Sequence, residues 1–284
     1  MGNEIWVLSE HTNHHLRDIS YELIAWAQKL SGILNSSIAA VVLADSLPDE
    51  EINNLIYHGA DKVYVAQHPV FNHFLVEPYA HTLQHLVSTY SPEIFLAGAT
   101  TTGRTAMPYL SMMLHTGLTA DCTDLAIETA TGDLLQIRPA IGGNILATIK
   151  TPGTRPQMAT VRPKSIAQIK PDRSRKGEII RVSPPDECIR TRMRFEESIP
   201  DGHGIAPLEE ADIVISGGLG MRSPDANQII EDLARILGAG VGSSRPPVDR
   251  GWQPYMRQVG LSGRTISPAL YIACGISGAV QHLA

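Results

Sequence analysis

Two glycine-rich turns near the end of the chain hold the residues whose types and spacing could do chemistry. SGGLG occupies residues 216–220 and GISG occupies residues 275–278, and each follows a short apolar run. Glycine lets the backbone come close to a phosphate, and the free N–H groups at the start of a helix attract its charge. Tight strand-to-helix connections also use glycine, and the first turn lacks the GxGxxG spacing of dinucleotide-binding proteins. Each turn alone is therefore compatible with a phosphate site or with a plain connection.

Polar side chains that could meet a ligand follow three strand-like runs, and they are Ser244, Arg245, Ser262, Gln281 and His282. Loops at the carboxyl ends of parallel strands gather along one edge of a sheet, so we expect these residues to converge. Together with many backbone N–H groups, they suit a dinucleotide that has a polar ring. They include no acid–base pair and no nucleophile–base set. We therefore predict no catalytic residue in this chain, and a bound cofactor would do the chemistry.

Four segments in this region carry a family resemblance. They are ADIVISGG, GAGVGSSRPPVDRGW, RQVGLSGR and LYIACGISGAVQHLA, in this order over residues 211–284. In order and spacing they resemble the FAD-binding domain of the electron transfer flavoprotein alpha subunit. The upstream segment AGATTTGRTAMPYLSMMLHTGLTADCTDL resembles the N-terminal domain of the same family. The resemblance thus spans most of the chain.

The resemblance implies a role for several of these side chains. Arg245 matches an arginine that lies against the flavin ring, where a fixed cation favours the reduced flavin and raises its potential. Ser244 matches a neighbouring serine that contacts the flavin. Ser262 matches a hydroxyl residue, commonly threonine, near flavin N5, and His282 matches a histidine at the flavin O2 edge.

Contacts to the ribityl chain and the phosphates are implied for Ser277 and Gln281. Residues that flank these positions in the same loops complete the predicted site. The predicted cofactor-binding residues are Ser244, Arg245, Gln258, Val259, Gly260, Leu261, Ser262, Gly263, Ser277, Gly278, Ala279, Val280, Gln281 and His282. The predicted cofactor is FAD.

Three departures from the family pattern affect this prediction. Leu219 stands where the family often has an arginine, which removes one cationic contact to the cofactor or to a partner. Leu261 replaces a glutamine of the family's QVGQTG loop, which removes a side chain that could recognise the cofactor. The family's domain usually continues beyond QHLA with residues that contact the adenosine end of FAD. We therefore expect a FAD-binding domain that is truncated at its C-terminal end and holds the flavin side of the site.

Strands and helices must position these residues, and the first part of the chain alternates between them. Apolar runs predict strands at residues 5–9, 38–44, 62–67 and 94–100, with helices at 15–31, 50–59 and 74–89 between them. This alternation is typical of an open, mostly parallel sheet with helices on both faces. The loop TTTGRT after the fourth strand could hold a phosphate, but the resemblance favours a structural or interface loop.

The pattern changes after the fourth strand. Residues 125–163 predict several strands with turns between them, which we interpret as an antiparallel addition to the first domain. Residues 163–210 are rich in proline and charge and are interpreted as a crossing segment and linker. A second α/β arrangement begins near residue 211. We therefore predict an N-terminal α/β domain with its linker at residues 1–205 and a FAD-binding α/β domain at 206–284.

Composition excludes several classes of function. The 284 residues carry a formal net charge of −6 with no lysine- or arginine-rich block, which argues against nucleic acid as the main partner. No run approaches the roughly 20 apolar residues of a membrane span, and no signal peptide is indicated. The three cysteines lie far apart and form no CxxC pair, so we predict no metal site and a reducing, cytoplasmic compartment.

The leading functional hypothesis is therefore an electron carrier. The chain would be the FAD-binding alpha subunit of a heterodimeric electron transfer flavoprotein. Its N-terminal domain would contact a beta subunit, and the flavin would pass electrons between a flavoprotein dehydrogenase and another acceptor. Within the same family, flavin-based electron bifurcation is a second possibility.

Two alternatives come from other classes. The chain could be a structural subunit that has lost its cofactor, which Leu219 and Leu261 favour. It could also be a nucleotide-dependent transferase on a similar fold, although that reaction needs a lysine or a nucleophile–base pair that is not found near the glycine turns.

Overall fold

The computed structural model describes residues 3–140, 145–197, 208–209, 211–260, 262–279 and 282. The chain divides into two compact units, each with its own hydrophobic core. The first comprises Met1–Pro139 and Leu146–Glu197, and the second is built mainly from Ser198–Ala284. Predicted Leu261, Val280 and Gln281 lie outside the described residues.

A seven-stranded parallel sheet forms the centre of the first unit, with strand order β12-β5-β4-β1-β6-β11-β7. Its four predicted strands are present, and they are continuous apolar runs because helices cover both of their faces. The strands are β1 (Glu4–Ser9), β4 (Ser37–Ala44), β5 (Lys62–Gln67), β6 (Ile94–Gly98), β7 (Leu118–Cys122), β11 (Gln157–Val161) and β12 (Glu178–Val182).

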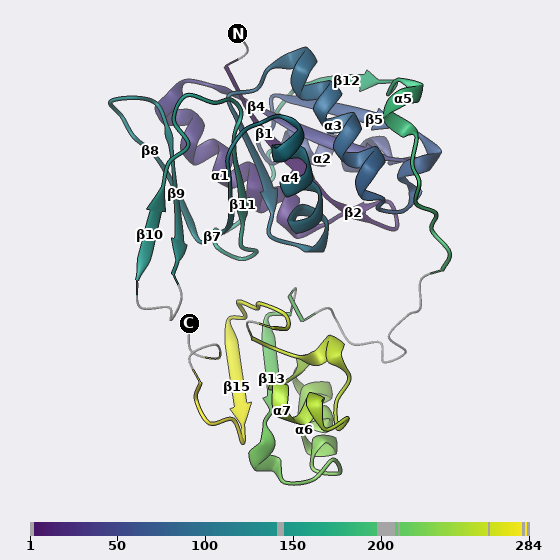
Figure 1. The fold of residues 1–284 in the computed structure, drawn as a ribbon, viewed down its shortest axis with the longest axis vertical. Coiled ribbons are helices and arrows are strands. Elements are labelled where there is room, and N and C mark those ends of the chain that lie inside the picture. The colour runs from purple at the N-terminus through teal and green to yellow at the C-terminus, as the bar shows by residue number, and fades with distance from the viewer. Residues whose placement is uncertain are drawn as a thin grey trace. The chain divides into compact units, whose positions relative to one another are not determined.

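Two pairs of helices cover this sheet, one pair on each face (Figure 1). Helices α1 (Asp18–Leu34) and α2 (Asp49–Tyr57) pack on one face, and α3 (Val76–Tyr90) and α4 (Thr101–Met113) pack on the other. Helix α1 begins three residues later than predicted, because β2 (His11–Thr12) and β3 (His15–Leu16) form a short antiparallel pair before it. Short segments η1 (Pro69–Asn72) and α5 (Asp186–Ile189) complete the helical part. The predicted α/β class is confirmed.

The antiparallel addition is smaller than predicted. It contains β8 (Asp124–Ile127), β9 (Leu134–Pro139) and β10 (Leu146–Ile149). Strand β11, which the sequence assigned to this addition, pairs in parallel with β6 and β7 within the main sheet instead. Strand β12 lies in the predicted linker and pairs in parallel with β5. Charged residues interrupt the apolar pattern of this edge strand, so the sequence did not predict it as a strand.

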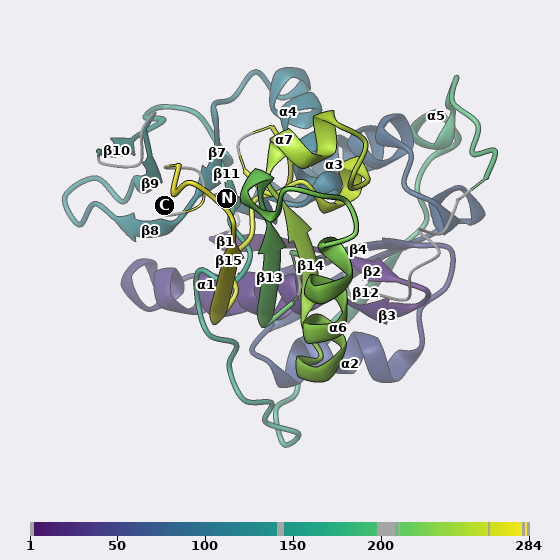
Figure 2. The ribbon, with the colours of Figure 1, turned by 90° about the horizontal axis from the view of Figure 1, so that it is seen from below.

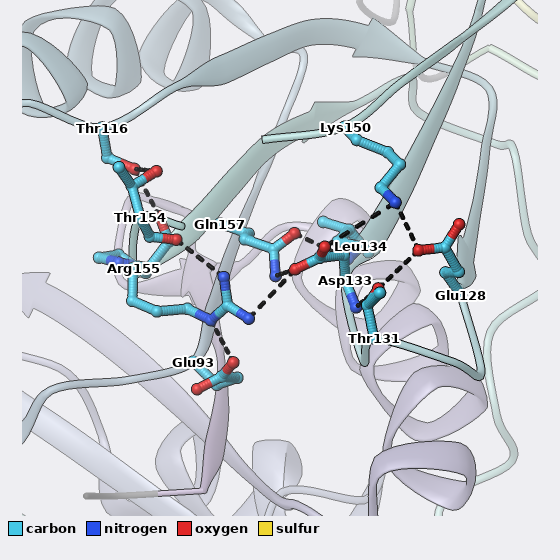
Figure 3. Close-up of polar contacts among 11 residues, drawn as sticks. Glu93, Thr116, Glu128, Thr131, Asp133, Leu134, Lys150, Thr154, Arg155 and Gln157 are labelled. Carbon is cyan, nitrogen blue, oxygen red and sulfur yellow. Dashed lines mark hydrogen bonds and ion pairs between the residues drawn. The ribbon is translucent and has the colours of Figure 1, made fainter. Parts of the chain in front are cut away.

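A polar network ties the antiparallel strands to the main sheet (Figure 3). The Arg155 guanidinium pairs with the carboxylate of Glu93, and its Nη2 lies 3.3 Å from Oδ1 of Asp133. The Lys150 ammonium pairs with Glu128, and its Nζ lies 3.9 Å from Oδ2 of Asp133. These five residues lie at the ends of β6, β8, β9, β10 and β11, so the network fixes the addition where its strands meet the sheet.

A buried carboxylate lies at the carboxyl end of β1. The Glu10 side chain accepts hydrogen bonds from Thr100 Oγ1 at 2.6 Å and from Arg17 Nη1 at 2.9 Å. Thr100 also caps helix α4 by accepting the Gly103 N–H at 3.1 Å. A Cβ atom at Gly98 would lie 3.1 Å from Glu10 Oε1, so the loop after β6 lies closely against the carboxylate.

The second unit contains a three-stranded parallel sheet with order β14-β13-β15 (Figure 2). Helix α6 packs on one face of this sheet, which is the βαβ arrangement that the sequence predicts. The elements are β13 (Ile213–Gly217), η2 (Leu219–Met221), α6 (Asn227–Leu237), β14 (Gly240–Ser243), α7 (Arg245–Asp249), η3 (Tyr255–Arg257) and β15 (Leu270–Cys274).

Helix α6 contacts the sheet through only some of its apolar residues. Ile230 and Ala234 are buried, whereas Ile229 and Ile236 are 66% and 80% exposed. Gly275–Ala279 forms an irregular turn after β15, and the His282 N–H donates to the Ala279 carbonyl at 2.9 Å. The helix start that the sequence predicts after this turn lies mostly outside the described residues.

Candidate cofactor site

A cleft of about 910 Å³ opens at the carboxyl ends of β13, β14 and β15. Each strand is followed at once by residues that line the cleft, because parallel strands end at the same edge of a sheet. Its described lining consists of Leu219, Gly220, Arg222, Ser244, Arg245, Pro246, Val259, Gly260, Ser262, Gly275, Ile276, Ser277, Ala279 and His282. A volume of this size fits the range of small-molecule and cofactor sites, about 300–1,000 Å³.

The two glycine turns pack directly against each other at one side of the cleft. The Gly218 N–H donates to the Cys274 carbonyl at 2.8 Å, and the Gly220 N–H donates to the Gly275 carbonyl at 2.9 Å. A Cβ atom at Gly218 would lie 2.3 Å from the Gly275 carbonyl oxygen. Only a residue without a side chain therefore permits this backbone contact.

Ser244 and Arg245 stand where β14 ends and α7 begins. The Ser244 N–H donates to the Gly217 carbonyl at 3.0 Å, which fixes the end of β14 beside the end of β13. The Ser244 side chain makes no capping bond to α7. The Arg245 side chain is exposed, and its Nε lies 3.1 Å from Oδ2 of Asp249, which is also exposed. An exposed pair of this kind is weak, so the guanidinium can turn to an anion in the cleft.

The loop that carries Ser262 is held at several points. Gln258 is buried, and its Nε2 donates to Ser262 Oγ at 2.9 Å. The Tyr255 hydroxyl donates to the Ser262 carbonyl at 2.8 Å. The Val259 N–H donates to the Ser243 carbonyl at 2.8 Å, which joins the loop to β14. Gln258, four residues before Ser262 in the same loop, thus supports the Ser262 hydroxyl.

His282 lies at the cleft beside Tyr271 of β15. Its Nδ1 lies 2.9 Å from the Tyr271 hydroxyl oxygen. Burial lowers the pKa of His282, so the ring is neutral at pH 7. Burial also raises the pKa of Tyr271, so its phenol stays protonated there. The pair therefore consists of two neutral groups, of which His282 lines the cleft.

The charges along the cleft are of one sign. Arg222 and Arg245 contribute guanidinium groups, and no Asp or Glu occurs among the described lining residues. Three serine hydroxyls add hydrogen-bonding groups, and Leu219, Val259 and Ile276 add apolar surface. Cations with no opposing carboxylate suit the phosphates of a dinucleotide, and apolar side chains suit a flat ring. The described residues therefore fit FAD.

The structure brings eight of the predicted site residues into the cleft lining: Ser244, Arg245, Val259, Gly260, Ser262, Ser277, Ala279 and His282. Gln258 and Gly263 lie behind the lining and shape the Ser262 loop, and Gly278 is not part of the lining. Leu219 lines the cleft, 38% exposed, as the residue in place of the family's arginine. Their contact with a cofactor stays a prediction.

Two residues at this site, Arg222 and Tyr271, are not among the residues predicted from the sequence. Arg222 follows the first glycine turn and adopts a left-handed backbone conformation, with φ of 68°, that brings it to the cleft. Its position as a basic residue two places after SGGLG is the sequence feature that could have indicated it as a site residue. Tyr271 lies inside an apolar strand, and its contact with His282 depends on the path of the chain after β15.

Family models match both units. The electron transfer flavoprotein domain matches residues 5–187, and the electron transfer flavoprotein FAD-binding domain matches residues 207–284. A relative from Thermoanaerobacterium thermosaccharolyticum, named electron transfer flavoprotein subunit alpha, is 42% identical over 281 residues. The chain belongs to the electron transfer flavoprotein alpha subunit family. The match covers 99% of this chain and 84% of that relative.

Other members of the electron transfer flavoprotein alpha subunit family are similar to the same extent. Protein FixB of Azotobacter vinelandii is 42% identical, with 98% of this chain and 78% of the relative covered. Electron transfer flavoprotein subunit alpha of Megasphaera elsdenii is 39% identical, with 99% and 83% covered. Within the part of the chain that the structure describes, no helix is long and apolar enough to cross a membrane.

Proposed function

We propose that this chain is the FAD-binding alpha subunit of a heterodimeric electron transfer flavoprotein. The observation that carries the proposal is the cleft at the carboxyl edge of the smaller sheet. There, Arg222 and Arg245 face the same space as three serine hydroxyls and His282, with no carboxylate among the described lining. Bound FAD would supply the redox chemistry, since the described lining contains no acid–base pair and no nucleophile–base set.

The side chains of the cleft would orient and polarise that cofactor. Arg245 would place a fixed positive charge beside it, which favours added negative charge. Ser262 would offer a hydroxyl whose position Gln258 holds through the 2.9 Å hydrogen bond. His282 would offer a ring nitrogen, and the glycine turns would let the backbone come close to the phosphates.

The partners follow from family membership rather than from the cleft. A subunit named alpha implies a beta subunit, and we propose that one binds this chain. We further propose that a flavoprotein dehydrogenase delivers electrons to the complex. Cys122, Cys188 and Cys274 are free thiols, which is consistent with the reducing cytoplasm that we propose as the compartment.

Flavin retention tests the proposal directly. The full chain is purified, incubated with FAD and the beta subunit, and desalted, and the flavin absorbance that stays with the protein is measured. We expect retained flavin for the unaltered chain. Its complete absence under these conditions would rule out the proposed function.

A charge variant then tests the role of the cleft. Arg245→Ala should weaken FAD binding about 10- to 100-fold, since a hydrogen bond from a charged group contributes about 1.5–3 kcal/mol. The matched control is Arg250→Ala, because Arg250 lies over the Trp252 ring, 5.3 Å from its centroid, and does not line the cleft. Equal losses in both variants would contradict a site at this cleft.

A further inference from the structure

Tyr271 occupies the second position of β15, on the face of the small sheet that is opposite to α6. Its side chain packs with Val214 and Val259, in the core that lies behind the cleft. It does not line the cleft itself. Its hydroxyl oxygen lies 2.9 Å from Nδ1 of His282, which does line the cleft, and the two rings are parallel within 4°.

We propose that Tyr271 is a positioning residue that fixes His282 in the tautomer with its proton on Nε2, so that the cleft meets an N–H donor. In a neutral imidazole one nitrogen carries the proton and the other accepts. If the phenol donates to Nδ1, the proton must be on Nε2. The tautomer of His282 therefore depends on whether the phenol or the imidazole donates the proton in the observed hydrogen bond.

The surroundings of the phenol decide the direction. Burial raises the pKa of Tyr271, so the hydroxyl keeps its proton at neutral pH, and that proton needs an acceptor. His282 Nδ1 is the acceptor within hydrogen-bonding distance among the described residues. The buried Ser216 hydroxyl also lies near the phenol, beyond hydrogen-bonding distance. It lowers the pKa of Tyr271, as a group that donates to the phenol oxygen does, so it does not take the phenol proton. If Nδ1 donated instead, the phenol proton would be left buried without a partner, which costs about 1–3 kcal/mol.

The other ring nitrogen is free to serve the cleft. His282 Nε2 makes no hydrogen bond to any residue that the structure describes, although the ring lines the cavity. A neutral N–H donor suits a carbonyl oxygen on a ring-shaped ligand, and it adds no charge. This step rests on the proposed function, which supplies the flavin as that ligand. The tautomer itself does not depend on which ligand binds.

The tautomer is measured in the full chain without any ligand. Uniformly ¹⁵N-labelled protein is studied by long-range ¹H–¹⁵N NMR, and the His282 signals are assigned from their loss in His282→Gln. We expect Nε2 to be protonated and Nδ1 to show the shift of a hydrogen-bonded acceptor. In Tyr271→Phe, which keeps the ring and its packing, the Nδ1 signal should move and a form protonated on Nδ1 should appear.

Tyr255→Phe is the matched control for this spectrum. It removes a phenol hydroxyl from the same unit, but that hydroxyl donates to the Ser262 carbonyl. We expect the His282 signals to be unchanged in this variant. A proton on Nδ1 in the unaltered chain would overturn the proposal, and so would identical His282 signals in Tyr271→Phe.

A double-mutant cycle tests whether Tyr271 acts through His282. Tyr271→Phe should raise the Kd for FAD about 2- to 12-fold in the unaltered background, as expected for one neutral hydrogen bond. In the His282→Gln background the same change should have no effect. An equal effect in both backgrounds would show a merely structural role. If the unaltered chain binds no FAD, the proposed function fails, and the NMR comparison still decides the tautomer.

Discussion

Glu77 on α3 holds a segment that is distant from it in sequence. Its carboxylate accepts hydrogen bonds from the Arg192 backbone N–H at 2.8 Å, the Arg192 Nε at 2.8 Å and the Thr191 hydroxyl at 3.1 Å. These bonds, the one to the Arg192 backbone first, lower the pKa of Glu77 from 4.5 to about 2. One carboxylate therefore attaches the chain after α5 to the helix layer of the first unit.

The lowered pKa predicts an acid-sensitive contact. The folded-state pKa lies below the unfolded value, so the stabilisation is complete above about pH 4.5 and is lost as the pH falls toward 2. We expect the melting temperature of the unaltered chain to fall more between pH 6 and pH 3 than that of Glu77→Gln. Circular dichroism melts at a series of pH values measure this. Glu50→Gln, on the exposed side of α2, serves as the control and should follow the unaltered chain.

At the scale of elements, the contact between the two glycine turns joins the ends of β13 and β15. The turn after β13 donates two backbone hydrogen bonds to the turn after β15. This contact positions the cleft residues that come from both turns, since Gly220 and Gly275 themselves line it. The turns thus act as one structural unit, although 54 residues lie between Gly220 and Gly275.

Gly218→Ala should break this contact. The new Cβ would lie 2.3 Å from the Gly275 carbonyl oxygen, so the turns must separate, which costs about 1–3 kcal/mol of stability. We expect a lower unfolding midpoint in urea for the second unit and weaker FAD binding. Gly32→Ala is the control, because no atom lies within 4 Å of its Cβ position in α1. That change should leave stability equal or raise it by up to about 1 kcal/mol, and a larger loss there than at Gly218 would contradict the prediction.

The elements that the sequence predicts best are those with a simple period. The core strands of the first sheet are apolar throughout, because both faces are buried, and their limits agree with the structure within a few residues. The edge strand β12 was missed because Glu178 and Arg181 interrupt its pattern. In α6, the helical period does not say which of two adjacent apolar residues faces the sheet. Ile230 does, and Ile229 does not.

The cleft was predictable in outline and not in detail. Parallel strands require that Arg245 and the turn after β15 gather at one edge, and the structure places them there. Ser262 reaches the same edge because the Val259 N–H bonds the Ser243 carbonyl at the end of β14. The chain is irregular over Gly275–Ala279, so the sequence pattern does not give the direction of the His282 side chain. The contact between His282 and Tyr271 could therefore be recognised only in the structure.

At the scale of the whole molecule, the two units have separate hydrophobic cores. The first contains two large clusters, one on each face of its seven-stranded sheet. The second contains two small clusters on a three-stranded sheet. Because stability grows with the apolar surface that is buried, the second unit should be the less stable.

We therefore expect two thermal transitions, with the second unit unfolding first. FAD should raise the lower transition and leave the upper one in place, because a ligand stabilises the unit that binds it, by about 2.7 kcal/mol at 100 times its Kd. Differential scanning calorimetry with and without FAD measures both. A single transition, or an equal shift of both, would contradict this prediction.

Glu10 affects which of the two sheets can accept an anion at its carboxyl edge. The carboxyl edge of an open parallel sheet is where such folds usually accept an anion, at a helix N-terminus. In the larger sheet that place already holds a carboxylate, bonded to Thr100 and Arg17. The chain's own carboxylate thus occupies the position that an anion would take. Because this carboxylate is covalently attached, it would always repel an incoming phosphate. The smaller sheet carries no such competitor among the described residues of its cleft.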